Sequence, residues 1–172
     1  LINSVSAFYL EDFYGQVSDV FKDPLLLHDL TTETEEDQGG NGADRIAQVL
    51  DAYAGELGVD GRNRRLYILD SEGLCLVSSD GETPQLEYTE NLSFALTTGL
   101  ETGETGDESN LALDYMDVAI PIHRGDEGYV IYILDNKSVA NELTNQMFLL
   151  IVEALIFGLA ISILLSFLLS KT

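Results

Sequence analysis

Apolar and polar residues follow three patterns along the chain: a helical period at the beginning, a strand period in the middle, and almost no polar residues near the end. At the beginning, apolar residues recur at steps of three and four and form one stripe of a helix: Ile2, Val5, Tyr9, Phe13, Val17 and Val20. Pro24 then predicts an end or a kink, because proline has no backbone N–H to donate. Asp29 to Gly42 has no apolar period after Leu30 and predicts a solvated acidic loop.

A second amphipathic helix precedes the strand-rich middle of the chain. Its apolar face is formed by Ile46, Val49, Tyr53 and Leu57, and Gly58 is a suitable C-terminal stop. Leu66–Leu69 and Leu74–Val77 then form two short apolar strands around the turn Asp70–Gly73. This arrangement predicts a β-hairpin.

A second hairpin is predicted after a segment with mixed signals. Leu92–Leu100 has the pattern of a short helix, and Glu101–Asn110 that of another solvated acidic loop. A long strand over 111–122 and a strand at 129–134 follow, joined by a turn at 123–128. The period of two in the long strand places Met116, Val118, Ile120 and Ile122 on one face, and Tyr115, Asp117 and Ala119 on the other.

The end of the chain is a helix that continues into an apolar run. The helical pattern starts at Lys137, and Met147–Leu169 reads MFLLIVEALIFGLAISILLSFLL, with Glu153 as its one charge and no proline. At about 1.5 Å per residue this run is about 34 Å long, enough for a hydrocarbon core of about 30 Å. A signal peptide is shorter and lies at the other end of a chain, and an apolar core helix of this length is rare in a small domain. We therefore predict a transmembrane helix.

The order helix, helix, hairpin, variable segment, hairpin, helix predicts an α+β fold with an antiparallel sheet. We divide the chain into a membrane-proximal N-terminal helix, a sensor-like domain, a helical connector, a transmembrane helix and the start of a linker, at 1–24, 25–136, 137–146, 147–169 and 170–172. The chain begins with Leu1 and stops just beyond the span, so we expect it to be part of a longer protein.

Composition restricts the partners and the location. The chain has 30 acidic and 8 basic residues, a formal net charge of −22. Such a surface is unsuited to nucleic acid and is repelled by anionic lipid head groups. By the positive-inside rule, Lys171 places the C-terminus in the cytoplasm and the acidic domain outside. Cys75 is the single cysteine and has no partner for an internal disulfide.

Three stretches of the sequence resemble a known family. YILDSEGLCLVSSD at 67–80 resembles the strand–turn–strand element of extracytoplasmic PAS-like sensor domains of the Cache (PDC) group. VAIPI at 118–122 with GYVIYILD at 128–135 is similar to their closing hairpin. The ending LSFLLSKT at 165–172 resembles the second membrane helix of a bacterial sensor histidine kinase, just before a HAMP linker.

The resemblance implies a fold, an assembly and a parent protein. The fold would be a long N-terminal helix and an antiparallel sheet of about five strands, in a homodimer framed by membrane helices. The parent would be a histidine kinase of the bacterial cell membrane that passes phosphoryl groups to a response regulator. ATP and Mg²⁺ would bind only its kinase domain, outside this chain. We find no residues for catalysis here, so this part is not expected to be an enzyme or to hold a cofactor.

Other functions remain open at this point. The same outside domain could serve a chemoreceptor or a cyclic-dinucleotide synthase, or the chain could be a membrane-anchored binding protein without an output domain. An extracellular enzyme is the least favoured alternative. The residues that follow Thr172 would distinguish the receptors.

The ligand of such a sensor would be a small molecule or an ion of unknown identity, bound over the sheet beside the variable segment. The candidate pocket residues are Arg65, Tyr67, Ser78, Tyr88, Tyr115, Asp117 and Tyr132. Each could equally belong to the edge of the core. Arg62, Arg64 and Arg65 could hold a carboxylate ligand, or could pair with Asp60, Asp70 or Glu72.

The apolar run carries a second group of candidate residues. Small side chains at every fourth position allow two membrane helices to approach closely, and Glu153 could hydrogen-bond across such a pair or extend to the outer head groups. We expect helix packing at Glu153, Ala154, Gly158 and Ser162. No metal site is expected, because His28 and His123 are isolated and neither acidic loop has the spacing of a calcium loop.

Overall fold

A computed structural model of the chain describes residues 2–34, 42–99 and 112–170. In these ranges an antiparallel sheet of four strands, in the order β2-β1-β4-β3, lies between helices on its two faces. The elements in chain order are α1 (Ile2–Phe21), α2 (Pro24–Thr31), α3 (Gly42–Asp51), β1 (Arg64–Asp70), β2 (Cys75–Ser78), α4 (Glu90–Thr98), β3 (Met116–Arg124), β4 (Glu127–Asp135) and α6 (Ser138–Ser170). The α+β class is confirmed, and a fifth strand is not among the described residues.

The first helix ends where the sequence predicts, but a further helix follows at once. α1 ends at Phe21, and the side chain of Asp23 accepts a hydrogen bond from the Leu25 N–H at the start of α2. Pro24 occupies the first turn of α2, where its missing N–H costs nothing. The predicted loop from Asp29 is therefore wrong as far as Thr31, because burial of Leu26 and Leu30 continues the helix. Most of the remaining loop lies outside the described residues.

The second predicted helix is shorter in the structure. α3 ends at Asp51, and the chain reaches Gly58 through turns, with φ +67° at this glycine. Leu57 is nonetheless buried, as predicted, and Ile46 and Leu50 are the buried side chains of α3 in the core. The turns thus replace the last predicted helical turns without moving Leu57 out of the core.

Both predicted hairpins are confirmed. β1 pairs with β2 on one side and with β4 on the other, and in the second pair the register runs from Arg64 opposite Asp135 to Asp70 opposite Tyr129. β3 pairs with β4 from Met116 opposite Asp135, so the long strand begins later than predicted. α4 at 90–98 confirms the short helix.

The sheet separates two apolar clusters. On one face, α1, α2 and α3 pack against side chains of β1, β3 and β4, including Met116, Val118, Ile120 and Ile122. On the other face, α4 covers a smaller cluster of Tyr67, Leu69, Cys75, Leu92, Ala95, Ala119, Val130 and Tyr132. The predicted alternation of β3 is confirmed. Cys75 is a free, buried cysteine, and burial raises the pKa of its thiol.

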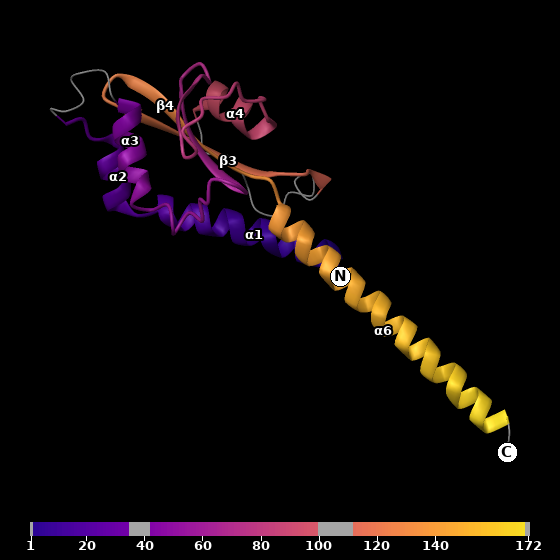
Figure 1. Cartoon of the computed structure of the whole chain (residues 1–172). Coiled ribbons are helices and arrows are strands. Elements are labelled where there is room, and N and C mark those ends of the chain that lie inside the picture. Colours follow the sequence, from indigo (N-terminus) through magenta and orange to yellow (C-terminus); the bar gives the residue numbers. More distant parts are fainter. Residues whose placement is uncertain (1, 35–41, 100–111, 171–172) are drawn as a thin grey trace.

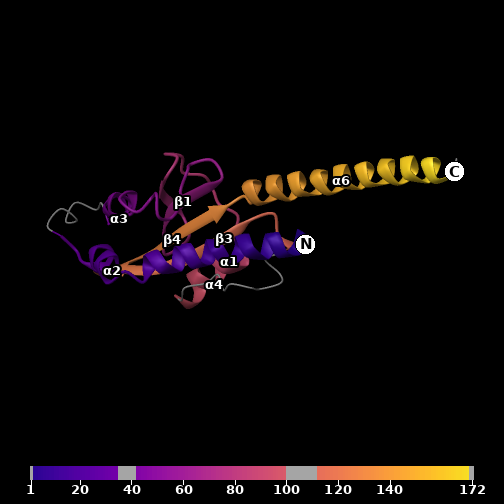
Figure 2. The same ribbon diagram turned by 90° about the horizontal axis from the view of Figure 1, so that it is seen from below.

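The last strand leads directly into one long helix. α6 runs without a break for 33 residues and projects away from the sheet, as Figure 1 shows. Nearly all of its apolar side chains from Phe148 onwards are exposed, and among the described residues only α6 is long and apolar enough to cross a membrane. Its first turns pack beside α1, where Ala140 is buried (Figures 1 and 2). The predicted connector and span are therefore one continuous helix.

Candidate functional site

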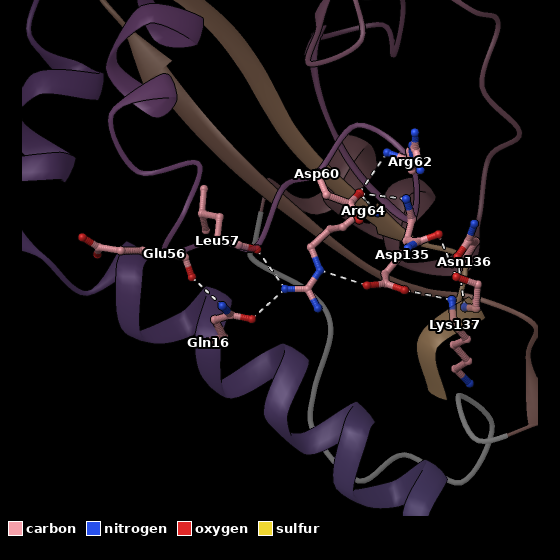
Figure 3. Close-up of polar contacts among 11 residues, drawn as sticks. Gln16, Glu56, Leu57, Asp60, Arg62, Arg64, Asp135, Asn136 and Lys137 are labelled. Carbon is pink, nitrogen blue, oxygen red and sulfur yellow. Dashed lines mark hydrogen bonds and ion pairs between the residues drawn. The ribbon is translucent and has the colours of Figure 1, made fainter. Parts of the chain in front are cut away.

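The guanidinium group of Arg64 connects three parts of the fold at the point where α6 leaves the domain (Figure 3). Its Nε donates to Oδ2 of Asp135 over 2.9 Å, and its Nη1 donates to Oε1 of Gln16 over 2.6 Å and to the carbonyl oxygen of Leu57 over 2.8 Å. The group also lies over the ring of Phe13, with Cζ 4.8 Å from the ring centre. We call Gln16, Leu57, Arg64 and Asp135 the Arg64 junction.

A carboxylate in the preceding loop fixes the backbone that presents Arg64. Oδ1 of Asp60 accepts hydrogen bonds from the N–H groups of Arg62, Asn63 and Arg64, at 2.9, 2.8 and 2.9 Å. Burial tends to raise the pKa of Asp60, but these amide donors outweigh it, so the pKa lies below its usual value. The aspartate therefore acts as a charged organiser of the turn before β1.

The start of α6 is tied to the same place. The second oxygen of Asp135, Oδ1, accepts from the Lys137 N–H over 2.8 Å. Oδ1 of Asn136 accepts from the Ser138 N–H over 3.0 Å, and the Ser138 hydroxyl donates to Oδ1 of Asn63 over 2.7 Å. The Asn136 N–H donates to the Asn63 carbonyl over 2.9 Å. The first turn of α6 is thus fixed to the loop before β1 as well as to the end of β4.

Lys137 makes the transition from strand to helix in an unusual conformation. Its φ is +55°, in the left-handed region that non-glycine residues rarely adopt, and only 5 % of its surface is exposed. Its Nζ donates to the carbonyl of Leu113 over 2.7 Å. Burial lowers the pKa of this amine, and the charges of Asp114 and Asp135 oppose that shift. The side chain therefore anchors the bend between β4 and α6 inside the protein.

A second polar group lies on the opposite face of the sheet. The carboxylate of Asp117 is 1 % exposed and accepts hydrogen bonds from Tyr132 Oη at 2.8 Å, Asn91 Nδ2 at 2.8 Å and Thr89 Oγ1 at 2.5 Å. The ring of Tyr67 stacks on that of Tyr132, with centres 6.2 Å apart. We call these five residues the Asp117 cluster. Burial, and then the charge of Asp117, raise the pKa of Tyr132.

The structure brings together only part of the predicted pocket. Tyr67, Asp117 and Tyr132 belong to the Asp117 cluster, and burial followed by the charge of Asp117 raises the pKa of Tyr115 nearby. Arg65 forms an ion pair with Asp80, with 3.3 Å between Nη1 and Oδ2, and its interaction with Tyr67, followed by the charge of Asp80, raises the pKa of Arg65.

The two remaining predicted pocket residues line separate grooves. Ser78, whose hydroxyl donates to Asp80, lines a groove of about 330 Å³ between α3 and the first hairpin. Tyr88 donates to the Glu72 carbonyl and lines a groove of about 770 Å³ beside β2. The buried Tyr67, Asp117 and Tyr132 line neither groove. No single cavity among those described therefore unites the predicted pocket, and its role in ligand binding stays a prediction.

The predicted packing residues of the apolar helix all lie on its surface. Glu153, Ala154, Gly158 and Ser162 are exposed, and a Cβ added at Gly158 would meet no atom within 4 Å. They are therefore accessible to lipid or to another helix. Among the described residues, no group of three or more His, Cys, Asp or Glu side chains is arranged to hold a metal ion.

No protein-family model matches this chain, and neither a curated protein nor a solved structure gives a significant match. The resemblance to PAS-like sensors therefore stays a prediction.

Sequence reasoning did not single out several residues that the structure places at these two sites. Gln16 and Asp135 complete the Arg64 junction, and Thr89 and Asn91 complete the Asp117 cluster. The position of Asp135 was a usable signal, since it is the last residue of an apolar strand directly before a helix. Gln16 gave no signal, because a polar residue on an amphipathic helix is ordinarily solvated.

Proposed function

We propose that the chain is the extracytoplasmic sensing part of a membrane-bound signalling protein, with α6 crossing the membrane. The observation that carries this proposal is the continuity of α6, which begins at the end of β4 and runs unbroken through its exposed apolar length. A helix rooted in a folded domain can pass a change in that domain along its axis. The acidic surface and the position of Lys171 support an outside domain and a cytoplasmic C-terminus in a bacterial cell membrane.

The signal and the assembly are part of the same proposal. The signal would be a small molecule or an ion that binds near the candidate pocket residues or at a subunit interface. The protein would act as a homodimer, with Ala154, Gly158 and Ser162 on the face where two α6 helices meet and Glu153 beside Ala154 at the edge of that face. A ligand can change the output only if it binds the two signalling states with different affinity.

The proposed output is a cytoplasmic histidine kinase that phosphorylates itself and a response regulator. The resemblance of 67–80, 118–135 and 165–172 to sensor kinases supports this choice. ATP and Mg²⁺ would bind that kinase domain. A chemoreceptor, a cyclic-dinucleotide synthase or a binding protein without an output domain are the alternatives, and sequencing the gene beyond Thr172 distinguishes these outputs.

Topology is the first test. A fluorescent protein that folds only in the cytoplasm, fused after Thr172, should fluoresce, and a phosphatase active only outside, fused in the turn at Gly81, should be active in the same cells. The reverse pattern at either position would contradict the proposed orientation.

Transmission is the second test. In this experiment, a chimeric protein is made in which residues 1–172 replace the sensor domain and second membrane helix of a characterised histidine kinase. Carboxylates, amino acids and divalent cations that raise the unfolding temperature of the full chain are then applied to this chimera. We expect them to change autophosphorylation at least about two-fold.

Three glycines inserted after Asn141 should abolish the response while the ligand still raises the unfolding temperature, because a flexible segment cannot carry a helix displacement. The same insertion after Gly81, in an exposed turn, is the matched control and should leave the response intact. A response that survives the insertion at Asn141 would contradict transmission through α6.

A further inference from the structure

We propose that Arg64 is the residue that couples the position of α1 to the first turn of α6. This inference rests on the proposed function for its role in signalling, but the coupling itself is a property of the folded domain. It concerns residues on the face of the sheet opposite the Asp117 cluster. It would make α1 a part of the signalling path as well as a packing helix.

The chain of contacts from α1 to α6 is short and continuous. Gln16 of α1 accepts from Arg64, Arg64 donates to Asp135, and Asp135 accepts from the Lys137 N–H. Phe13, one turn before Gln16, lies under the same guanidinium. A displacement of Gln16 therefore either breaks its hydrogen bond with Arg64 or shifts the guanidinium that holds the Asp135 carboxylate, in addition to the direct packing of α1 on the first turns of α6.

Because the Arg64 junction is partly buried, its contacts are expected to form and break cooperatively. The side chains of Arg64 and Asp135 are 14 % and 12 % exposed, so their ion pair is shielded from solvent. Loss of one partner would leave the other charge partly buried and unpaired, which is costly compared with an exposed pair. Gln16 also donates to the Glu56 carbonyl over 2.6 Å, so the α1 side is fixed at both ends of its amide.

An arginine is suited to this position for a geometric reason. Its planar group carries several donors in fixed directions, so one side chain can hold a carboxylate, an amide oxygen and a backbone carbonyl together. A lysine has one compact charge and would not keep the three distances. Arg64→Lys should therefore retain the charge and lose the coupling.

The neighbouring Arg65 provides a matched control. It lies on the same strand but pairs with Asp80, and its side chain is 43 % exposed. Neither α1 nor α6 takes part in this ion pair. Arg65→Lys therefore makes the same chemical change one residue away without touching the junction.

Hydrogen exchange of the full chain in lipid nanodiscs tests the coupling without any ligand. Gln16→Met removes the hydrogen-bonding end of the side chain that α1 contributes, at similar volume. We expect it to speed exchange about five-fold at residues 138–142, the first turn of α6, although no hydrogen bond or ion pair joins Gln16 to any of them. In an Arg64→Lys background the same change should have no further effect on 138–142, because the path is already broken.

Asp135→Asn is the second variant of this experiment. It removes the charge of the ion pair but keeps an oxygen that can accept from the Lys137 N–H, so it should speed exchange at 138–142 and also within α1. Arg65→Lys should change neither region. Circular dichroism spectra equal to that of the original chain establish that each variant is folded.

The proposal is overturned if Gln16→Met affects exchange in α1 alone, or if its effect on 138–142 is the same in both backgrounds. Autophosphorylation of the chimera separates this result from the proposed function. If exchange shows the coupling and neither Gln16→Met nor Asp135→Asn changes kinase activity, the coupling stands and the signalling role fails. If kinase activity changes while exchange at 138–142 does not, the coupling through Arg64 is wrong and the sensing function stands.

Discussion

The hydroxyl of Tyr132 donates a hydrogen bond to the carboxylate of Asp117 over 2.8 Å, between two side chains that are each 1 % exposed. The residue opposite Asp117 in the sheet register is Leu134, and the one opposite Tyr132 is Ala119, so the bond runs diagonally across β3 and β4. It joins the two strands beneath α4, on the face away from α1.

Removing the donor of this bond should destabilise the domain. Tyr132→Phe leaves a buried carboxylate oxygen with one donor fewer, and we expect the free energy of unfolding to fall by about 1–3 kcal/mol. Tyr88→Phe is the matched control, since Tyr88 is 58 % exposed and donates only to the Glu72 carbonyl. It should cost about 0.5 kcal/mol or less. Urea denaturation of the full chain in detergent measures both, and equal losses would contradict a special role of the buried bond.

The turn organised by Asp60 should make stability depend on acid pH. The folded-state pKa of Asp60 lies below its usual value of 3.8, so its contribution to stability is fully present above that value and is lost as the pH falls through the folded-state pKa. Asp60→Asn keeps an acceptor oxygen and removes the titration.

The difference in unfolding temperature between the original chain and Asp60→Asn should therefore be largest near pH 6 and should shrink towards pH 3. Asp12→Asn, an exposed carboxylate on α1, is the control and should show a smaller change over the same range. A constant difference for Asp60→Asn would show that its charge does not stabilise the turn.

Lys137 should give a trend of the same sign at alkaline pH. Burial lowers its pKa in the folded protein from the usual 10.5, so the unfolded chain binds more protons between the two values and stability rises with pH in that window. Lys137→Met removes the titration. We expect the original chain to gain stability relative to this variant as the pH rises towards 10.5, measured as the difference of their unfolding temperatures. If the original chain instead loses stability relative to the variant as the pH rises, the charges of Asp114 and Asp135 outweigh burial in setting the pKa of Lys137.

The proposed contact between two α6 helices can be tested at Gly158. Gly158→Ile adds a branched side chain where close approach of helices is proposed, and should weaken self-association of the chain by about 1 kcal/mol. Leu159→Ile, on an adjacent exposed position, should have little effect. Energy transfer between labelled chains diluted with lipid measures both. If both variants associate like the original chain, the helices do not meet at this face.

The elements that sequence reasoning predicted correctly are those defined by local patterns. The β1–β2 and β3–β4 hairpins follow from a period of two on either side of turn residues. α2 lies outside the prediction although Asp23-Pro24 is a helix-start signal, because a proline that ends or kinks one helix can also occupy the first turn of the next. The spacing of Ile46, Val49 and Tyr53 predicts a helix that includes Tyr53. The turn that begins after Asp51 does not interrupt this spacing, so the sequence does not reveal it.

The site depended on contacts that spacing cannot reveal. The sequence grouped Arg64 with Arg62 and Arg65 and suggested Asp60, Asp70 or Glu72 as partners. Asp60 does hold this segment, but through backbone N–H groups. The side chain of Arg64 pairs with Asp135 because antiparallel pairing of β1 and β4 places these two residues opposite each other.

The continuity of α6 makes the helix a lever. Its 33 residues correspond to a length of about 50 Å. If its first turn tilts by about 5°, the far end moves sideways by about 4 Å, comparable to the displacement of one helical turn relative to its neighbour. A displacement small enough to break one hydrogen bond at Gln16 would thus become a larger displacement on the other side of the bilayer, with α6 pivoting at Asp135.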